Sequence, residues 1–315
     1  MKAVIFFSGL AGLLIFGPPF IKSRTHKHEV SVIVHEAVKT ERVAYPADAA
    51  EGQVSWDDQS QCRFEAERAT SVPLGSIREL QLSAGAGSLE VIGVEGLREI
   101  QAVGRACASH EEFLEDIRLT AEVDGSTLFM KTHHPEMRGW SSGNRYASLD
   151  LRVEVPAGLA AEILDGSGEM TVRDLGSAMI QDGSGEVEIY DIRGDLSVED
   201  GSGELLIQGV AGVVRVEDGS GELVLIDAGS DVEIHDSSGE VAIRGVHGSV
   251  TLRDSSGELE IQDVTGSVRV LQDSSGDIAV RGVGGDFIVE RDGSGDISHE
   301  GVQGSVDIPR KRGRM

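Results

Sequence analysis

The fold is decided by a stretch in the second half of the chain, where residues 182–200 have the sequence DGSGEVEIYDIRGDLSVED. Val187 and Ile189 alternate with polar residues, and after a turn Leu196 and Val198 do the same. A period of two is the pattern of a strand that buries one face. The stretch is therefore predicted to form two short strands separated by turns that are rich in Gly and Asp.

This pattern recurs along the second half of the chain. The motif Asp-(Gly/Ser)-Ser-Gly-(Glu/Asp) occurs eight times, at intervals of 17 to 19 residues. Its aspartates are Asp165, Asp182, Asp200, Asp218, Asp236, Asp254, Asp273 and Asp292. Each unit also has one apolar residue at its other corner, namely Leu175, Ile192, Val210, Ala228, Val246, Val264, Val283 and Val302. Such regular repetition indicates a stack of equivalent units.

A unit of two short strands cannot bury its own apolar face. Units stacked about 4.8 Å apart can do so, by forming an apolar column between two thin parallel sheets. We therefore predict an all-β, two-sheet β-solenoid of about 18-residue coils, with eight coils over 161–308 and a small α/β cap insertion before them. A meander of antiparallel hairpins is the competing arrangement, but equivalent positions would not match along it. In the predicted register Val241 and Ile243 point inward, while Glu240 and Ala242 point outward.

The repeated motif is interpreted as turn chemistry. Its glycine would supply a positive φ, and its Asp and Ser side chains would bond to backbone N–H groups of the turn. The alternative is a cation ladder, because stacking places Asp182, Asp200 and Asp218 one coil apart, with Glu186 and Glu204 following in their motifs. A calcium β-roll has coils of similar size, but its nonapeptide is absent here. No cofactor is therefore predicted, calcium is the alternative, and no metal ligands are assigned.

Composition limits the classes of function. The chain of 315 residues has 54 acidic and 28 basic residues, which gives a formal net charge of -26. This charge argues against a nucleic-acid partner, since such binding depends on Lys and Arg against phosphate. Aromatic residues make up 4% and hydrophobic residues 39%, so the expected core is slim and aliphatic. With 41 glycines, the composition excludes a helical bundle and a polytopic membrane protein.

No catalytic site is predicted. The DSSG segment at 236–239 is one residue longer than the Asp-(Ser/Thr)-Gly of aspartic proteases. A motif that is present eight times in register also lacks the single special environment that a catalytic group requires. The sequence therefore predicts a protein that is not an enzyme.

The N-terminal region has the pattern of an export signal. A lysine precedes the mostly apolar run 3–16, which ends at a Gly-Pro-Pro segment. Residues 1–22 are predicted to be a signal peptide or membrane anchor, 23–60 a tether, and 309–315 a basic, solvated tail. The predicted location is the periplasm or cell envelope, with membrane contact only through the N-terminal segment.

The two cysteines are Cys62 and Cys107. An even pair in an exported chain is usually oxidised, so they are a disulfide candidate. Two reduced, buried thiols are the alternative. A metal site would need more ligands than two isolated thiolates.

The region 61–160 is expected to hold a degenerate first coil, starting near Leu80, and the cap of the solenoid. The segment Ser109–Glu112 resembles a capping box and predicts a short helix through about Ile117. Strands are predicted over 119–123, 127–132 and 148–156.

Two further segments lead into the coils, LEVIG at 89–93 and LRVEVPAG at 151–158. Together with the serial DGSGE turns they resemble the bacterial DUF4097 family of adhesin-type domains, over about 63–308. The resemblance implies an extracytoplasmic β-solenoid and supplies no catalytic residues. The expected function is a scaffold or adhesin-like interaction protein of the bacterial envelope, with an envelope protein or surface glycan as partner. A calcium-binding, β-roll-like surface protein is the alternative.

Overall fold

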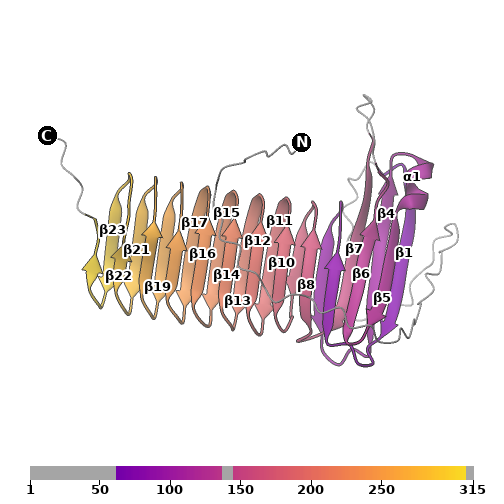
Figure 1. Cartoon of the computed structure of the whole chain (residues 1–315), viewed down its shortest axis with the longest axis horizontal. Coiled ribbons are helices and arrows are strands. Elements are labelled where there is room, and N and C mark those ends of the chain that lie inside the picture. The colour runs from indigo at the N-terminus through magenta and orange to yellow at the C-terminus, as the bar shows by residue number, and fades with distance from the viewer. Residues whose placement is uncertain (1–61, 137–144, 310–315) are drawn as a thin grey trace, which may run out of the picture. The chain divides into compact units, whose positions relative to one another are not determined.

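The computed structural model describes residues 62–136 and 145–309. The signal or anchor predicted at 1–22, the tether at 23–60 and all but the first residue of the basic tail lie outside these residues. The described residues form two twelve-stranded sheets (Figure 1), here called sheet A and sheet B. The predicted all-β, two-sheet β-solenoid is confirmed.

In spatial order, sheet A consists of β24 (Val306–Asp307), β22 (Phe287–Val289), β20 (Val268–Gln272), β18 (Val250–Arg253), β16 (Val232–Asp236), β14 (Val214–Asp218), β12 (Leu196–Asp200), β10 (Ala178–Asp182), β8 (Ala160–Asp165), β2 (Glu79–Ser83), β6 (Thr127–His133) and β5 (Arg118–Asp124). Sheet B consists of β1 (Phe64–Pro73), β4 (Glu99–Ala108), β7 (Ala147–Pro156), β3 (Leu89–Val94), β9 (Met170–Arg173), β11 (Gly185–Ile192), β13 (Gly203–Val210), β15 (Gly221–Ala228), β17 (Gly239–Val246), β19 (Leu259–Val264), β21 (Ile278–Val283) and β23 (Ile297–Val302).

From β8 onward the chain alternates between the two sheets, and each strand pairs in parallel with its equivalent one coil away. In sheet A, Leu196 of β12 lies opposite Val214 of β14. In sheet B, Leu205 of β13 lies opposite Leu223 of β15. Parallel pairing in this register excludes the antiparallel meander. The two strands of a coil differ in length, as shown by β12 with five residues and β11 with eight.

An aliphatic column fills the space between the sheets. Val241 and Ile243 are buried, Glu240 is exposed and Ala242 is partly exposed, so the predicted register is confirmed. The corner residues from Leu175 to Val283 are likewise buried. Because neighbouring coils supply the same residue types at the same height, the column is continuous.

A capping region, defined as β1, β4, β5, β6, β7 and the helix α1 (Glu111–Asp116), lies at one end of the array (Figure 1). The degenerate first coil is β2 and β3, which pair in parallel with β8 and β9. The cap strand β1 precedes this coil in the chain, whereas the other cap elements are inserted between β3 and β8. The cap pairs β1–β4, β4–β7 and β5–β6 are antiparallel. The strands predicted over 119–123, 127–132 and 148–156 are found as β5, β6 and β7.

The predicted short helix is found as α1, but its predicted cap is not. It ends at Asp116, and its N-cap residue is His110, with no side-chain capping bond. The predicted capping box does not form, because the Ser109 hydroxyl donates to the Tyr146 carbonyl oxygen at 3.2 Å and accepts from the Tyr146 N–H at 3.1 Å. Among the described residues, no helix is long and apolar enough to span a membrane.

Candidate functional site

The Asp-x-Ser-Gly turns connect the end of each sheet A strand to the next strand of sheet B. Their glycines have positive φ in all eight coils, from 132° at Gly295 to 151° at Gly257. A Cβ built on Gly221 would overlap the carbonyl oxygen of Gly203 in the preceding coil. Glycine is therefore required both by the backbone conformation, as predicted, and by the close stacking of the turns.

The backbone N–H groups of these turns bond between coils. Gly203 donates to the Ser220 carbonyl oxygen at 3.0 Å, and Gly219 donates to the Asp200 carbonyl oxygen at 2.9 Å. Equivalent bonds repeat along the array. The neighbouring coils thus satisfy the turn amides that the sequence assigned to the motif side chains.

Seven of the eight motif aspartates are buried at the turns and form a stack, here called the aspartate column. Its members, with exposed fractions from 2% to 8%, are Asp165, Asp182, Asp200, Asp218, Asp236, Asp254 and Asp273. The partly exposed Asp292 follows, and its backbone forms an isolated parallel β-bridge with that of Asp273. Within the column, only Asp254 makes the predicted bond, its Oδ1 accepting from the Ser256 N–H at 3.0 Å. Both carboxyl oxygens of the other six are buried without a hydrogen-bond partner.

Burial raises the pKa of six carboxyl groups of the column above the ordinary value of 3.8, namely those of Asp165, Asp182, Asp200, Asp218, Asp236 and Asp273. The pKa is raised to about 6 at Asp182, Asp200 and Asp218 and to about 7 at Asp236 and Asp273. Desolvation is the largest cause, and interactions with neighbouring aspartates add to it.

The motif glutamates are separated from the column. Glu186, Glu204 and Glu222 are exposed at the start of sheet B strands. Across the described ranges, no group of three or more His, Cys, Asp or Glu side chains is arranged to hold a metal ion. The ligand set that the sequence suggested for calcium is therefore divided between the interior and the surface.

The exposed acids form a row of their own, here called the outer acidic row. Its members are Glu169, Glu186, Glu204, Glu222, Glu240, Glu258, Asp277 and Asp296. Register pairs such as Glu204 with Glu222 place successive carboxylates one coil apart. The row therefore presents a line of negative charge with a spacing of about 4.8 Å.

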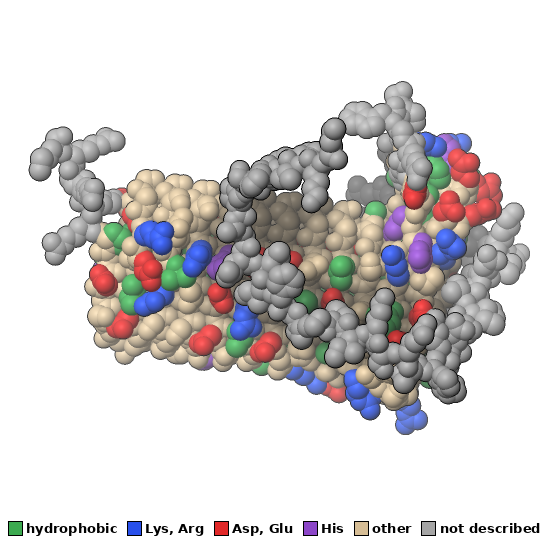
Figure 2. Space-filling view, in the orientation of Figure 1, with side chains coloured by type: hydrophobic (Ala, Val, Ile, Leu, Met, Phe, Trp, Pro, Cys, Tyr) green, Lys and Arg blue, Asp and Glu red, His purple; other side chains and the backbone are tan. Residues whose placement is uncertain are grey.

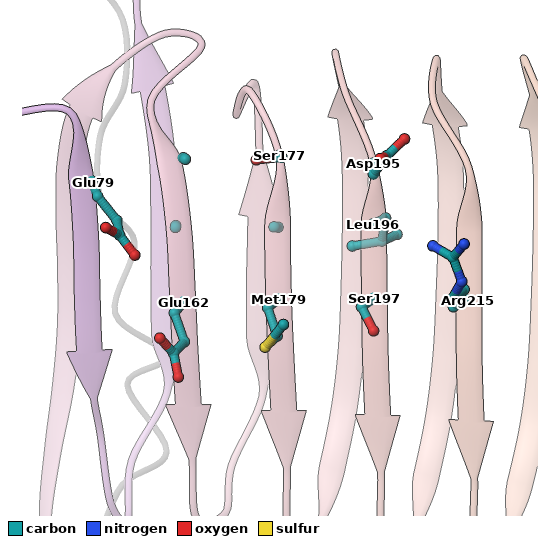
Figure 3. Close-up of a pocket in the computed structure, with 11 residues that line it drawn as sticks. Glu79, Glu162, Ser177, Met179, Asp195, Leu196, Ser197 and Arg215 are labelled. Carbon is teal, nitrogen blue, oxygen red and sulfur yellow. The ribbon is translucent and has the colours of Figure 1, made fainter. Parts of the chain in front are cut away.

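The outer face of sheet A contains two shallow hollows. One, of about 410 Å³, lies where the first coils meet and is lined by residues that include Glu79, Glu162, Met179 and Arg215 (Figure 3). Met179 is 51% exposed there. The other, of about 350 Å³, lies over the ends of β12, β14 and β16. On the uncovered part of the face in Figure 2, acidic and basic side chains are interspersed.

Sequence reasoning missed the aspartates that do bond to the backbone. They precede the sheet A strands: Asp195 Oδ1 accepts from the Val213 N–H at 2.9 Å, and Asp231 Oδ1 accepts from the Ser249 N–H at 2.8 Å. Ser249 continues the ladder, its Oγ accepting from the Ser267 N–H at 3.2 Å. The signal was the repeated Asp or Ser at this position, three residues after the apolar corner.

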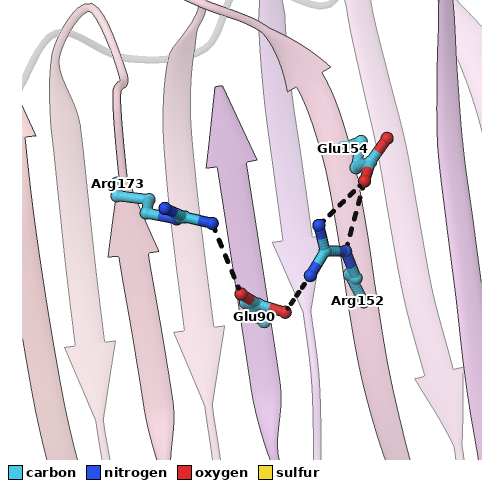
Figure 4. Close-up of polar contacts among 4 residues, drawn as sticks. All are labelled: Glu90, Arg152, Glu154 and Arg173. Carbon is cyan, nitrogen blue, oxygen red and sulfur yellow. Dashed lines mark hydrogen bonds and ion pairs between the residues drawn. The ribbon is translucent and has the colours of Figure 1, made fainter. Parts of the chain in front are cut away.

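One side-chain connection lies within the capping region, and another joins the cap to the first coils. Cys62 and Cys107 are joined in a disulfide, with their Cα atoms 5.5 Å apart, which ties the residues before β1 to β4. On the outer face of sheet B, Arg152 Nη1 lies 2.8 Å from Glu90 Oε2 and its Nη2 lies 3.0 Å from Glu154 Oε1. Arg173 reaches Glu90 from the first array coil at 3.9 Å (Figure 4). This ion-pair network links the cap strand β7 to β3 and β9.

No protein-family model matches the chain, and no curated protein matches it in sequence. Solved structures with similarity include a "putative lipid binding protein" of Parabacteroides distasonis, 12% identical with a TM-score of 0.44, covering 76% of this chain and 96% of that one. A "putative cell adhesion protein" of Clostridium sporogenes is 11% identical with a TM-score of 0.27, covering 78% and 99% of the two chains. A "putative adhesin" of Bacteroides fragilis is 12% identical with a TM-score of 0.28, covering 77% and 96%. At these identities the likeness concerns the fold alone.

Proposed function

We propose that this chain is a non-enzymatic, extracytoplasmic β-solenoid that acts as a scaffold or adhesin-like interaction protein of the bacterial envelope. The observation that carries the proposal is the outer acidic row, in which successive coils present an equivalent exposed carboxylate. A repeated surface of this kind suits extended contact with a partner, whereas catalysis needs one special environment.

The partner class follows from charge and compartment. A net charge of -26 disfavours nucleic acid, and an exposed line of carboxylates suits a partner with regularly spaced cationic or hydrogen-bond donor groups. The Cys62–Cys107 disulfide supports an oxidising compartment, and the resemblance to DUF4097 supports an envelope location. An envelope protein or a surface glycan is therefore the proposed partner.

Capture of partners from envelope fractions by the folded full chain tests this function. The decisive variant changes Glu186, Glu204 and Glu222 to Gln in the outer acidic row. A matched control removes three exposed charges directly before the apolar corners, through Asp191→Asn, Asp227→Asn and Asp263→Asn. Asparagine is chosen because it tolerates the positive φ of these positions.

The expected result is one purified envelope protein or glycan that binds the wild type and the Asn control saturably and binds the Gln variant at least tenfold more weakly. Equal binding of all three proteins would show that the outer acidic row is not the contact surface. Recovery of the protein from the cytoplasm alone would contradict the envelope location.

The calcium-stabilised alternative is favoured by the stacked, unpartnered carboxylates. It predicts a chain that is unfolded in chelator and folds when calcium is added at matched ionic strength. The scaffold function predicts β-type circular dichroism already in chelator, because the aliphatic column supplies a continuous core. Sodium chloride is the control for simple charge screening.

A further inference from the structure

The aspartate column brings buried carboxyl groups into direct succession. Asp182 is paired in register with Asp165 on one side and Asp200 on the other, and Asp218 with Asp200 and Asp236. Successive members are therefore one strand spacing apart, about 4.8 Å. Their oxygen atoms are enclosed by the turns and have essentially no contact with solvent.

Within the described ranges, no positive charge balances the column. On sheet A, Glu199, Glu217 and His235 immediately precede column members and lie around the hollow on the outer face. On sheet B, the ionisable residues that follow the turns belong to the exposed outer acidic row, as Glu222 does. The ionisable groups with the largest effect on the pKa of Asp218 are its column neighbours Asp200 and Asp236. In the described part of the chain, no Lys, Arg or His forms an ion pair with a column member.

An ionised carboxylate can only accept hydrogen bonds, so a column of ionised aspartates would leave both oxygens of six of its seven members without a donor. Burying an unpaired charge is strongly unfavourable, and like charges at this spacing repel. Register pairing nevertheless sets the carboxyl groups of adjacent members such as Asp182 and Asp200 beside each other, and a hydrogen bond between them would satisfy one oxygen of each. Such a bond requires that one of the two carboxyl groups carry a proton.

We propose that the aspartate column is a proton-binding site, in which adjacent carboxyl groups share protons taken up from solvent and thereby hold the coils together. In each shared pair the protonated carboxyl donates its O–H to the neighbouring carboxylate, so one proton removes one buried charge and satisfies two oxygens. The site is distinct from the proposed contact surface and does not depend on the proposed function.

The proposal fixes the direction of the pH dependence. In the folded chain the pKa is about 6 at Asp200 and about 7 at Asp236, whereas an unfolded aspartate releases its proton near 3.8. The native state therefore binds more protons than the unfolded state between these limits, and stability falls as pH rises through them. This is opposite to the behaviour of an aspartate that is held by a salt bridge.

The experiment compares Asp218→Asn with Glu222→Gln, which removes the same charge from the exposed row of the same coil. Thermal unfolding of the full chain is followed from pH 5 to pH 8, in chelator and at high salt, so that surface repulsion is screened. The wild type and Glu222→Gln should lose at least about 5 °C of melting temperature over this range. Asp218→Asn should melt higher than the wild type at pH 8 and show a smaller loss, because its amide donates at every pH.

A direct measurement on the wild type keeps the proposal testable if a variant fails to fold. Carbon-13 NMR of the aspartate carboxyl groups should show a set that titrates near pH 6 to 7 in the folded chain. Titration of all aspartates near pH 4 would overturn the proposal, and so would an unchanged pH slope in folded Asp218→Asn. A stabilisation at pH 8 that requires calcium and is lost in Asp218→Asn would replace the proton site by a metal site.

Discussion

The capping region and the coil array extend the same two sheets, but their strands find their partners in different ways. In the cap, β1 pairs with β4 in antiparallel register over its whole length, from Phe64 to Pro73. The cap also relies on contacts that occur once, such as the disulfide and the Arg152 ion pairs. In the array, every strand meets a near copy of itself, and the same contact is repeated from coil to coil.

This difference determines which substitutions destabilise each region most. A unique contact in the cap can be lost while the rest of the molecule keeps its neighbours. A coil of the array contacts only the coils on either side, so a defect in one coil separates two halves of the stack. Substitutions at repeated, buried positions should therefore cost more than the loss of a unique connection.

The largest effect is expected for Ile243→Asp in the middle of the array. The Ile243 side chain is 1% exposed, so the variant buries an unpaired charge and should lose about 4 kcal/mol of unfolding free energy. Ala242→Asp, on the outer face of the same strand, should change it by less than about 0.5 kcal/mol. Urea unfolding measures both, and equal losses would show that the inward register is wrong.

The next effect is expected for Gly221→Ala. Its Cβ would meet the backbone of the preceding coil at a φ of 145°, and the expected loss is about 3 kcal/mol. The control is Gly96→Ala in a turn near the cap, where φ is 72° and no atom lies within 4 Å of the added carbon. There the expected loss is only about 1 kcal/mol. A control that loses as much as Gly221→Ala would mean that stacking is not the cause.

Removal of the disulfide should lower the free energy of unfolding of the capping region by about 3 kcal/mol and leave the array unaffected. In Cys62→Ala/Cys107→Ala, amide hydrogen exchange should quicken in β1 and β4, while β15 keeps its protection. Protein recovered from the envelope should have both cysteines blocked to alkylation under non-reducing, denaturing conditions. Two freely alkylated thiols there would contradict both the disulfide and the oxidising compartment.

The smallest effect is expected for Arg152→Met. The partners of Arg152 are about one-third exposed, so the network should contribute only about 1 kcal/mol. Arg193→Met, which removes an exposed ion pair with Glu95, should leave the unfolding midpoint unchanged. A loss at Arg152 as large as that of Gly221→Ala would place this junction among the critical contacts of the molecule.

The sequence was sufficient to predict the array because repetition carries information on register. When Leu205, Leu223 and Val241 recur at one position, the pairing of their strands follows without knowledge of any other contact. The cap offers no such repetition. Ser109 has the sequence context of a helix cap, yet its hydroxyl bonds to Tyr146, which lies 37 residues away and directly before β7.

The environment of the motif aspartates could not be derived from one coil. Within a single turn, Asp200 is a reasonable acceptor for the turn amides. Only stacking reveals that the Gly201 N–H donates to the Asp182 carbonyl oxygen of the coil before, at 3.0 Å. The backbone conformation before the apolar corner was likewise not predicted from one coil. Asp191 and Asp227 adopt a positive φ at this position, where Gly209 and Gly245 stand in other coils.

The match between neighbouring coils has a consequence for how such a gene can change. Duplicating or deleting one whole coil, for example from Asp200 to Glu217, would rejoin equivalent positions. Each remaining pair of neighbouring coils would then contain the same types of contact as before. The molecule could thus be lengthened or shortened in increments of about 4.8 Å. An insertion of one residue within a strand would instead turn the following side chains to the opposite face. Selection should therefore tolerate variation in the number of coils far more readily than variation in the length of their strands.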